Sequence, residues 1–236
     1  MFFILYRSKI SVLFDVLTKK IADATRLKAG QLEFETSQEI KDVVQRAGDA
    51  AGDGIQKGEI PKSQIQAARE VSKKLQDSPL SDWRATNVVQ DQLFSLIKDY
   101  ERIREDMGAG PARTKRMNEV AAKMRTLSLA AQPLLRSLTS GQTAGERLAA
   151  ICILQVAPET GFFSWLIERL KSENQAFMLF QASVAVLNLV KAQKYLNGAN
   201  VRKEIAGALE HVKNFEGGTP DPNTIDVLNE SLSLVR

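Results

Sequence analysis

Residues 146–193, ERLAAICILQVAPETGFFSWLIERLKSENQAFMLFQASVAVLNLVKAQ, decide the fold. They contain three apolar-rich segments in succession, separated by short breaks at 157–161 and 172–174. Segments this apolar and this closely joined stay in solution only when they pack on one another and on neighbours, as antiparallel helices do. The stretch therefore predicts a helical core.

Helical periodicity continues on both sides of this stretch. Apolar residues recur every three or four positions, which places them on one face of a helix, in the segments 61–76, 87–107, 112–138, 143–154, 199–215 and 224–235. Pro133 predicts a kink or a restart within the third of these. Helix pairs of about 30–45 residues joined by tight turns have the size of HEAT units. We therefore predict an all-α fold of stacked antiparallel helix pairs, HEAT-like in arrangement.

The N-terminal segment has a different pattern. Residues 3–28 have the spacing of one amphipathic helix, and Gly30 is predicted to end it. Residues 31–36 alternate polar and apolar, which predicts a single short β-strand. Ser37 then has the character of a helix cap, and a further helix is predicted to about residue 45.

Glycines suggest where the chain divides. Gly48, Gly52, Gly54 and Gly58 fall within eleven residues, which indicates a loop or linker. The predicted organisation is an N-terminal unit over residues 1–47, a glycine-rich linker over 48–60 and a helical interaction domain over 61–236.

Cysteine and histidine content limits the chemistry. The chain has one cysteine, Cys152, and one histidine, His211. A single cysteine forms no disulfide within the chain, which is typical of a reducing compartment, and the usual multi-histidine or Cys/His zinc sites are excluded. Cys152 lies between isoleucines and is predicted to be buried, and His211 is predicted to lie at the surface. There is no phosphate-binding glycine motif and no complete calcium loop.

Positive charge gathers in two segments, although the formal net charge is only +4. Residues 1–28 hold six basic and two acidic residues, and residues 111–136 hold six and one. Such zones favour contact with anionic lipid, nucleic acid or an acidic protein. The residues predicted to contact an anionic partner are Arg113, Lys115, Arg116, Lys123 and Arg125.

The apolar stripe of the N-terminal helix is a second predicted surface. Its residues predicted to meet a partner protein or a membrane are Phe2, Phe3, Leu5, Leu13, Phe14 and Leu17. The run from Met1 to Tyr6 ends at Arg7, far short of the roughly 20 apolar residues of a membrane span. Of the tryptophans, Trp165 is predicted to pack between helices, and Trp83 is predicted either to anchor an interface or, as we favour, to fold back on the protein.

Three segments carry a resemblance to a known kind of module: YERIREDMGAGPARTKRM at 100–117, ERLAAI at 146–151 and FSWLIERL at 163–170. Together they resemble a helical module of bacterial conflict and signalling proteins, over residues 95–236. The resemblance implies a HEAT-like adaptor that links an effector or sensor to a partner, without catalytic residues. Separately, LKAGQLEFE at 27–35 resembles the juxtamembrane piece that follows a transmembrane helix in some bacterial membrane proteins.

These patterns predict a non-enzymatic helical scaffold or adaptor that mediates protein–protein association, with no catalytic residues, no cofactor and no metal. The expected partner is another protein or a second copy of the chain, in the cytoplasm. One alternative is a peripheral membrane protein held at the inner membrane face by its basic N-terminal helix. The other is a nucleic-acid-binding module that uses residues 113–125, which we favour least because aromatic platforms lie elsewhere.

Overall fold

The computed structural model describes residues 2–51, 54–55, 58–193, 198–215 and 221–235, and within its first helix it leaves the side chains of residues 2–18 and 21–26 undescribed. Over the described residues the chain is all-α, as predicted, with ten α-helices, two short 3₁₀ helices and no strand. The α-helices are α1 (Phe2–Asp49), α2 (Lys62–Asp77), α3 (Asp82–Asp106), α4 (Pro111–Leu127), α5 (Leu135–Thr139), α6 (Ala144–Val156), α7 (Phe163–Ser172), α8 (Ala176–Ala192), α9 (Ala199–Lys213) and α10 (Pro222–Leu234).

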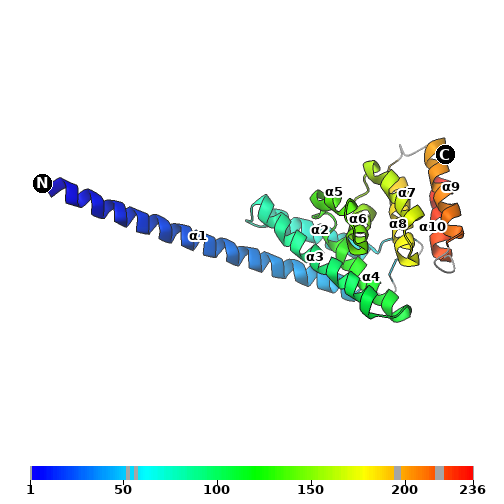
Figure 1. Cartoon of the computed structure of the whole chain (residues 1–236), viewed down its shortest axis with the longest axis horizontal. Helices are drawn as coiled ribbons and strands as arrows, with labels where there is room; N and C mark the ends of the chain where they lie inside the picture. The colour runs from blue at the N-terminus through cyan, green and yellow to red at the C-terminus, as the bar shows by residue number, and fades with distance from the viewer. Residues whose placement is uncertain (1, 52–53, 56–57, 194–197, 216–220, 236) are drawn as a thin grey trace.

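One helix sets the shape of the molecule. α1 has 48 residues and is therefore about 70 Å long. Figure 1 shows it as a rod whose C-terminal part lies against α2, α3 and α4, while the rest projects away from the body that the other helices form. The N-terminus lies at the free end of this rod, and the C-terminus lies at the opposite end of the molecule.

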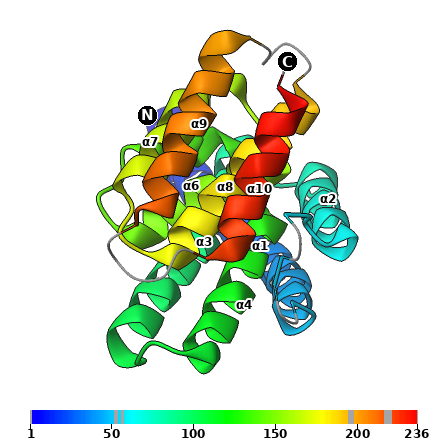
Figure 2. The same ribbon diagram turned by 90° about the vertical axis from the view of Figure 1, so that its right-hand side faces the viewer.

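The body is built around α4, α6 and α8. α4 packs against α1, α2, α3 and α6, and α8 packs against α6, α7 and α10. α9 closes one end by packing on α7 and α10 (Figure 2). α6 has no solvent-facing side over Leu148–Leu154, all of which are fully buried. A helix that is apolar all round is stable only inside a core, so the decisive stretch is helical and central as predicted.

Local signals end and begin the helices near the predicted positions. Thr143 caps α6 with a complete capping box, in which its side chain accepts from the Glu146 amide and Glu146 bonds back to the Thr143 amide. Pro133 lies in the 3₁₀ turn Gln132–Leu134, where the chain restarts as α5. The breaks after Val156 and Ser172 fall where the sequence indicated them.

The strand predicted for residues 31–36 is wrong, because α1 continues through Gly30 and Phe34 without interruption. Six alternating residues are too few to distinguish a strand from a helix whose two faces both carry some apolar groups. Contacts along the helix favour the helical form here. The Gln31 amide donates to the Glu35 carboxylate one turn later, and Thr36 and Ile40 are buried against the body.

The glycine-rich segment after α1 is packed rather than free, in the part of it that the structure describes. Ile55 is buried with Val184, Leu187 and Val227 in a small cluster between this segment, α8 and α10. Gly58 has a φ of 72°, and a Cβ there would lie 2.9 Å from the Leu187 Cδ2 atom. Glycine is therefore required for a turn and for close approach, not for mobility.

We expect Ile55→Ala to lower the free energy of unfolding by about 2–4 kcal/mol, because it removes buried apolar surface and leaves a cavity. Glu59→Ala, in the same segment but exposed, should change it by less than about 0.5 kcal/mol. Urea unfolding followed by circular dichroism measures both. Equal small effects would mean that the segment behaves in solution as the free linker predicted from its glycines.

Candidate interaction surfaces

The C-terminal part of α1 is anchored to the body by one apolar face. The buried residues on that face are Thr36, Ile40, Val43, Val44 and Ala47. Three ion pairs join the same part of the helix to α2 and α3: Glu33 with Arg84 at 3.1 Å, Glu39 with Lys74 at 3.0 Å and Arg46 with Glu70 at 3.5 Å. The anchor thus combines apolar burial with ion pairs spread over about 14 residues.

Apolar side chains are exposed where α1 leaves the body. Leu27 is 76% exposed and Phe34 is 63% exposed, whereas large apolar residues of the body are mostly buried. Lys19, Lys20 and Lys28 are exposed on the same helix. Leu27 and Phe34 are therefore the candidate interaction residues in the described part of α1.

The interface residues predicted from sequence, Phe2, Phe3, Leu5, Leu13, Phe14 and Leu17, belong to α1, but their side chains lie outside the described residues. Their prediction therefore stays a prediction. Sequence reasoning missed Leu27 as an interface residue because it assigned a helix end and a strand immediately after it. It missed Phe34 because it placed that residue in the strand.

The two tryptophans differ in environment. Trp165 is partly buried, packs against the core, and donates from its indole nitrogen to the Thr139 carbonyl oxygen at 3.0 Å, as predicted. Trp83 is 61% exposed and does not fold back into the core. The Arg84 guanidinium lies 4.9 Å from its ring centroid, and Arg84 also pairs with Glu33 of α1. Trp83 therefore lies close to the point where α1 leaves the body.

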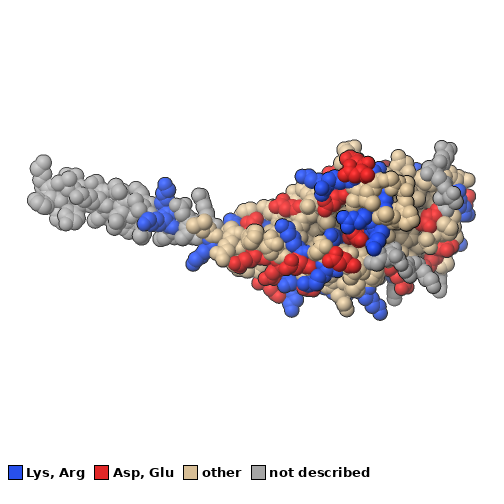
Figure 3. Space-filling view, turned by 90° about the horizontal axis from the view of Figure 1, so that it is seen from below, with Lys and Arg blue, Asp and Glu red and all other residues tan. Residues whose placement is uncertain are grey.

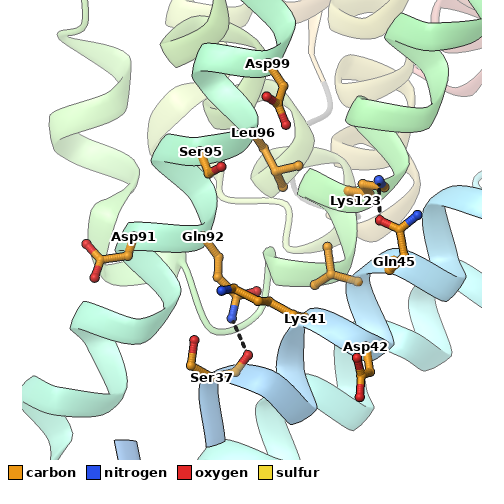
Figure 4. Close-up of a pocket in the computed structure, with 11 residues that line it drawn as sticks. Ser37, Lys41, Asp42, Gln45, Asp91, Gln92, Ser95, Leu96, Asp99 and Lys123 are labelled. Carbon is orange, nitrogen blue, oxygen red and sulfur yellow. Dashed lines mark hydrogen bonds between the residues drawn. The ribbon is translucent and has the colours of Figure 1, made fainter. Parts of the chain in front are cut away.

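A crevice of about 570 Å³ separates α1 from α3, with α4 contributing Lys123. Figure 4 shows two hydrogen bonds across it, from the Gln92 and Lys123 side chains to α1. The Gln92 amide nitrogen donates to the Ser37 carbonyl oxygen at 3.0 Å, and the Lys123 ammonium donates to the Gln45 side-chain oxygen at 2.7 Å. The aliphatic part of the Lys123 side chain passes over Gly48, where a Cβ would overlap it. Gly48 thus leaves room for the Lys123 side chain beside α1.

The crevice offers hydrogen-bonding groups of both charges. Asp42, Asp91 and Asp99 line it together with Lys41 and Lys123. In the described part of the chain, no three His, Cys, Asp or Glu side chains group closely enough to hold a metal ion. Its chemistry is that of a polar contact surface beside the anchored part of α1.

The five basic residues predicted to contact an anionic partner are not equivalent. Lys115 is exposed and Arg116 pairs with Glu119 at 2.9 Å. Arg113 donates to the Met107 carbonyl oxygen, and Lys123 is bonded to Gln45. Figure 3 shows acidic and basic side chains interspersed over the face that it views. These residues therefore do not form one basic stripe.

The prediction that Arg125 contacts an anionic partner is wrong, because the side chain is fully buried and cannot reach an external anion. Its Nε donates to the Gln64 side-chain oxygen at 2.6 Å. Its Nη1 donates to the side-chain oxygens of Gln155 and Gln181 at 3.0 and 3.1 Å. One side chain of α4 thus joins α2, α6 and α8 through three amide oxygens.

Burial shifts the titration of two neighbouring groups in this cluster. It lowers the pKa of Arg125, because the charged guanidinium loses its hydration, while adjacent Cys152 acts in the opposite direction. Burial also raises the pKa of the Cys152 thiol to about 11, against the opposing effect of Arg125. The thiol is therefore neutral near pH 7, as predicted for a core cysteine, and it lacks the thiolate that a nucleophile requires. His211 is exposed, also as predicted.

Sequence reasoning missed the glutamine cluster around Arg125. A signal was present, since Gln155 follows the apolar run 148–154 and Gln181 interrupts the apolar run of α8. A buried amide needs a hydrogen-bond partner, so each of these glutamines predicted a polar group inside the core. The partner could not be identified because Arg125 belongs to a segment whose other basic residues favour the surface.

No family model matches this chain, and comparison with the curated proteins and with the solved structures finds no significant similarity. None of the helices among the described residues has the length and apolar character needed to cross a membrane.

We expect Gln64→Ala to lower the free energy of unfolding by about 3 kcal/mol, because it leaves a buried cationic donor without its acceptor. Gln45→Ala is the matched control, since Gln45 also accepts from a cation but on the exposed side of α1. It should cost less than about 1 kcal/mol. Urea unfolding at neutral pH measures both. Equal losses of unfolding free energy in the two variants would show that the buried contact of Gln64 with Arg125 stabilises the protein no more than the exposed contact of Gln45 with Lys123.

Proposed function

We propose that this chain is a non-enzymatic helical scaffold that associates with other protein chains through α1. The observation that carries the proposal is the exposure of Leu27 and Phe34 on a helix that projects from a packed body. In water, burying one such side chain contributes about 1.5–3 kcal/mol. Covering this face with protein is therefore favourable.

The way α1 is held supports a scaffold role. A helix that binds a partner can hold that partner at a defined place relative to the body only if the helix itself is fixed to the body. The C-terminal part of α1 is fixed by the buried residues Ile40 and Val43 and by ion pairs to α2 and α3. The body behind it is closely packed around α4, α6 and α8. A partner bound to α1 is thus held at a defined distance and direction from the body.

The resemblance of residues 95–236 to a HEAT-like module of bacterial conflict and signalling proteins adds a biological setting to this proposal. In that setting the body acts as an adaptor, and α1 joins it to an effector, a sensor or another copy. Nucleic-acid binding through residues 113–125 is not part of the proposal, because Arg125 is buried and Arg116 and Lys123 already have protein partners.

Site-specific photocrosslinking in the native host tests the proposal. With p-benzoylphenylalanine in place of Leu27 or Phe34, we expect crosslinks to protein, because these positions lie on the face that a partner covers. The same group in place of Lys203, which is exposed on α9, is the control and should give few adducts. Mass spectrometry identifies the products.

Adducts at all three positions alike, or at none, would contradict the proposal. Adducts to lipid alone at positions 27 and 34 would favour the second candidate function below.

The second candidate is peripheral membrane binding, favoured by exposed Lys19 and Lys28 close to exposed Leu27 on α1. A helix that combines basic and apolar groups can lie in the headgroup region of an anionic membrane. Each lysine near such a surface contributes about 1 kcal/mol.

Vesicle flotation tests this candidate. We expect the full chain to float with vesicles that contain phosphatidylglycerol and to remain below with neutral phosphatidylcholine vesicles. Lys19→Glu together with Lys28→Glu should lower the partition coefficient by roughly tenfold or more. Absence of flotation with the anionic vesicles would remove the candidate.

A further inference from the structure

The exposed apolar residues of α1 belong to a longer regular pattern. Leu27 and Phe34 are seven residues apart, and both are exposed. The same spacing of seven residues runs through α1 in two alternating series. The first series is Phe3, Ile10, Leu17 and Ala24, and the second is Tyr6, Leu13, Lys20, Leu27 and Phe34. Gln31 follows in the first series. This alternation of three and four residues is the a/d pattern of a coiled coil. We call these residues the α1 seam.

Leu27 and Phe34, the exposed apolar residues of the seam in the described part of α1, lie away from the anchored face. Successive residues on a helix are rotated by about 100°, so Phe34 is turned by about 120° and Leu27 by about 140° from Ile40. Ile40 is completely buried on the anchored face. A helix laid along the seam therefore meets the side of α1 that the body leaves open, and two such bodies would lie on opposite outer sides of a pair.

A second α1 seam would bury enough surface to form a stable dimer. The segment from Phe3 to Phe34 spans about 46 Å of helix, and each chain contributes three aromatic residues to it. An aromatic side chain buries about 150–250 Å², so these residues and the leucines together exceed the roughly 1,200 Å² of a specific interface. An unpaired helix of this length with an apolar face has no comparable stabilisation of its own.

Charges beside the seam favour a parallel pair in register. The series that begins at Phe3 holds the a positions of the heptad, and the series that begins at Tyr6 holds the d positions. In this register Asp23 occupies a g position, and Lys28 occupies the e position of the next heptad. These two positions face each other between parallel chains, and their opposite charges attract. Lys20 occupies a d position, where the two chains bring like charges together. Polar residues in a seam weaken the pair and fix its register, and this seam has two, Lys20 and Gln31.

We propose that the occupant of the α1 seam is a second copy of this chain, paired as a parallel two-stranded coiled coil over residues 3–34. This inference rests on the proposed function, because it names the partner that α1 binds. The pair holds two bodies at the C-terminal ends of the coiled coil.

Adjacent lysines give the sharpest test. Lys19 and Lys20 are both exposed in the single chain, but only Lys20 lies in the seam. Lys20→Leu should lower the dimer dissociation constant by roughly tenfold or more, because it replaces facing charges with an apolar layer. Lys19→Leu adds the same apolar surface outside the seam and should change the constant by less than about twofold. Sedimentation velocity of the full chain over a range of concentrations measures both.

The complementary variants remove the seam. The full wild-type chain should approach twice its mass of 26.1 kDa as concentration rises. Leu27→Asp combined with Phe34→Asp should raise the dissociation constant by roughly a hundredfold or more, whereas Lys19→Asp should leave it within about threefold. Unchanged thermal melting of the body, followed by circular dichroism, shows that these exposed substitutions leave it folded.

A wild-type chain that stays at 26.1 kDa up to about 100 µM would overturn the pairing. Equal effects of Lys20→Leu and Lys19→Leu, or a dimer that survives the double Asp variant, would overturn it as well. If the purified chain is monomeric while positions 27 and 34 still crosslink to another protein in the host, the pairing fails and the proposed function stands. If those positions crosslink only to lipid, the proposed function fails with it.

Discussion

A single buried cation imposes the strictest constraint on the body. Among the described residues, the hydrogen-bond acceptors recorded for the Arg125 guanidinium are uncharged, the side-chain oxygens of Gln64, Gln155 and Gln181. A charge in the core without hydrogen bonds is strongly destabilising, so α2, α6 and α8 must all be in place around α4 at once. Apolar packing alone tolerates rotation of a helix about its axis, but this contact does not. The cluster therefore fixes how the central helices are turned toward one another.

A second buried charge is stabilised in a different way. Glu173 is buried at the junction of α7 and α8, and both oxygens of its carboxylate accept from Arg147 of α6, at 2.5 and 3.2 Å. Unlike Arg125, Glu173 therefore belongs to an ion pair, in which the opposite charge of Arg147 offsets the loss of hydration. The two sites lie on different helix junctions of the same core. Together they make the body a defined platform for α1 rather than a loosely packed bundle.

Sequence predicted the body better than it predicted α1. Long apolar segments such as those of α6 and α8 have one stable arrangement, and their short breaks coincide with Pro158 and with the turn after Ser172. Gly30 and the alternation after it favoured a strand, because local pattern does not show that the helix containing Ile40 and Val43, which lie against the body, is continuous with the N-terminal helix. The described residues between Asp49 and Lys62 form no helix, as their glycines indicated, but the φ of 72° at Gly58 shows that glycine there permits a turn. The position of Leu27 on an open face could be assigned only once the helix was known to continue.

The anchoring of α1 near one end gives the molecule a mechanical property. The projecting part, about 30 residues long, is a helical arm of roughly 45 Å. A tilt of about 5° at its root therefore moves its tip by roughly 4 Å. Small rearrangements around Glu33, Glu39 and Arg46, whose ion pairs fasten that root, are in this way magnified into displacements about as large as a side chain. A small rearrangement of the ion pairs at the root of α1 therefore moves the distant N-terminal end of the helix.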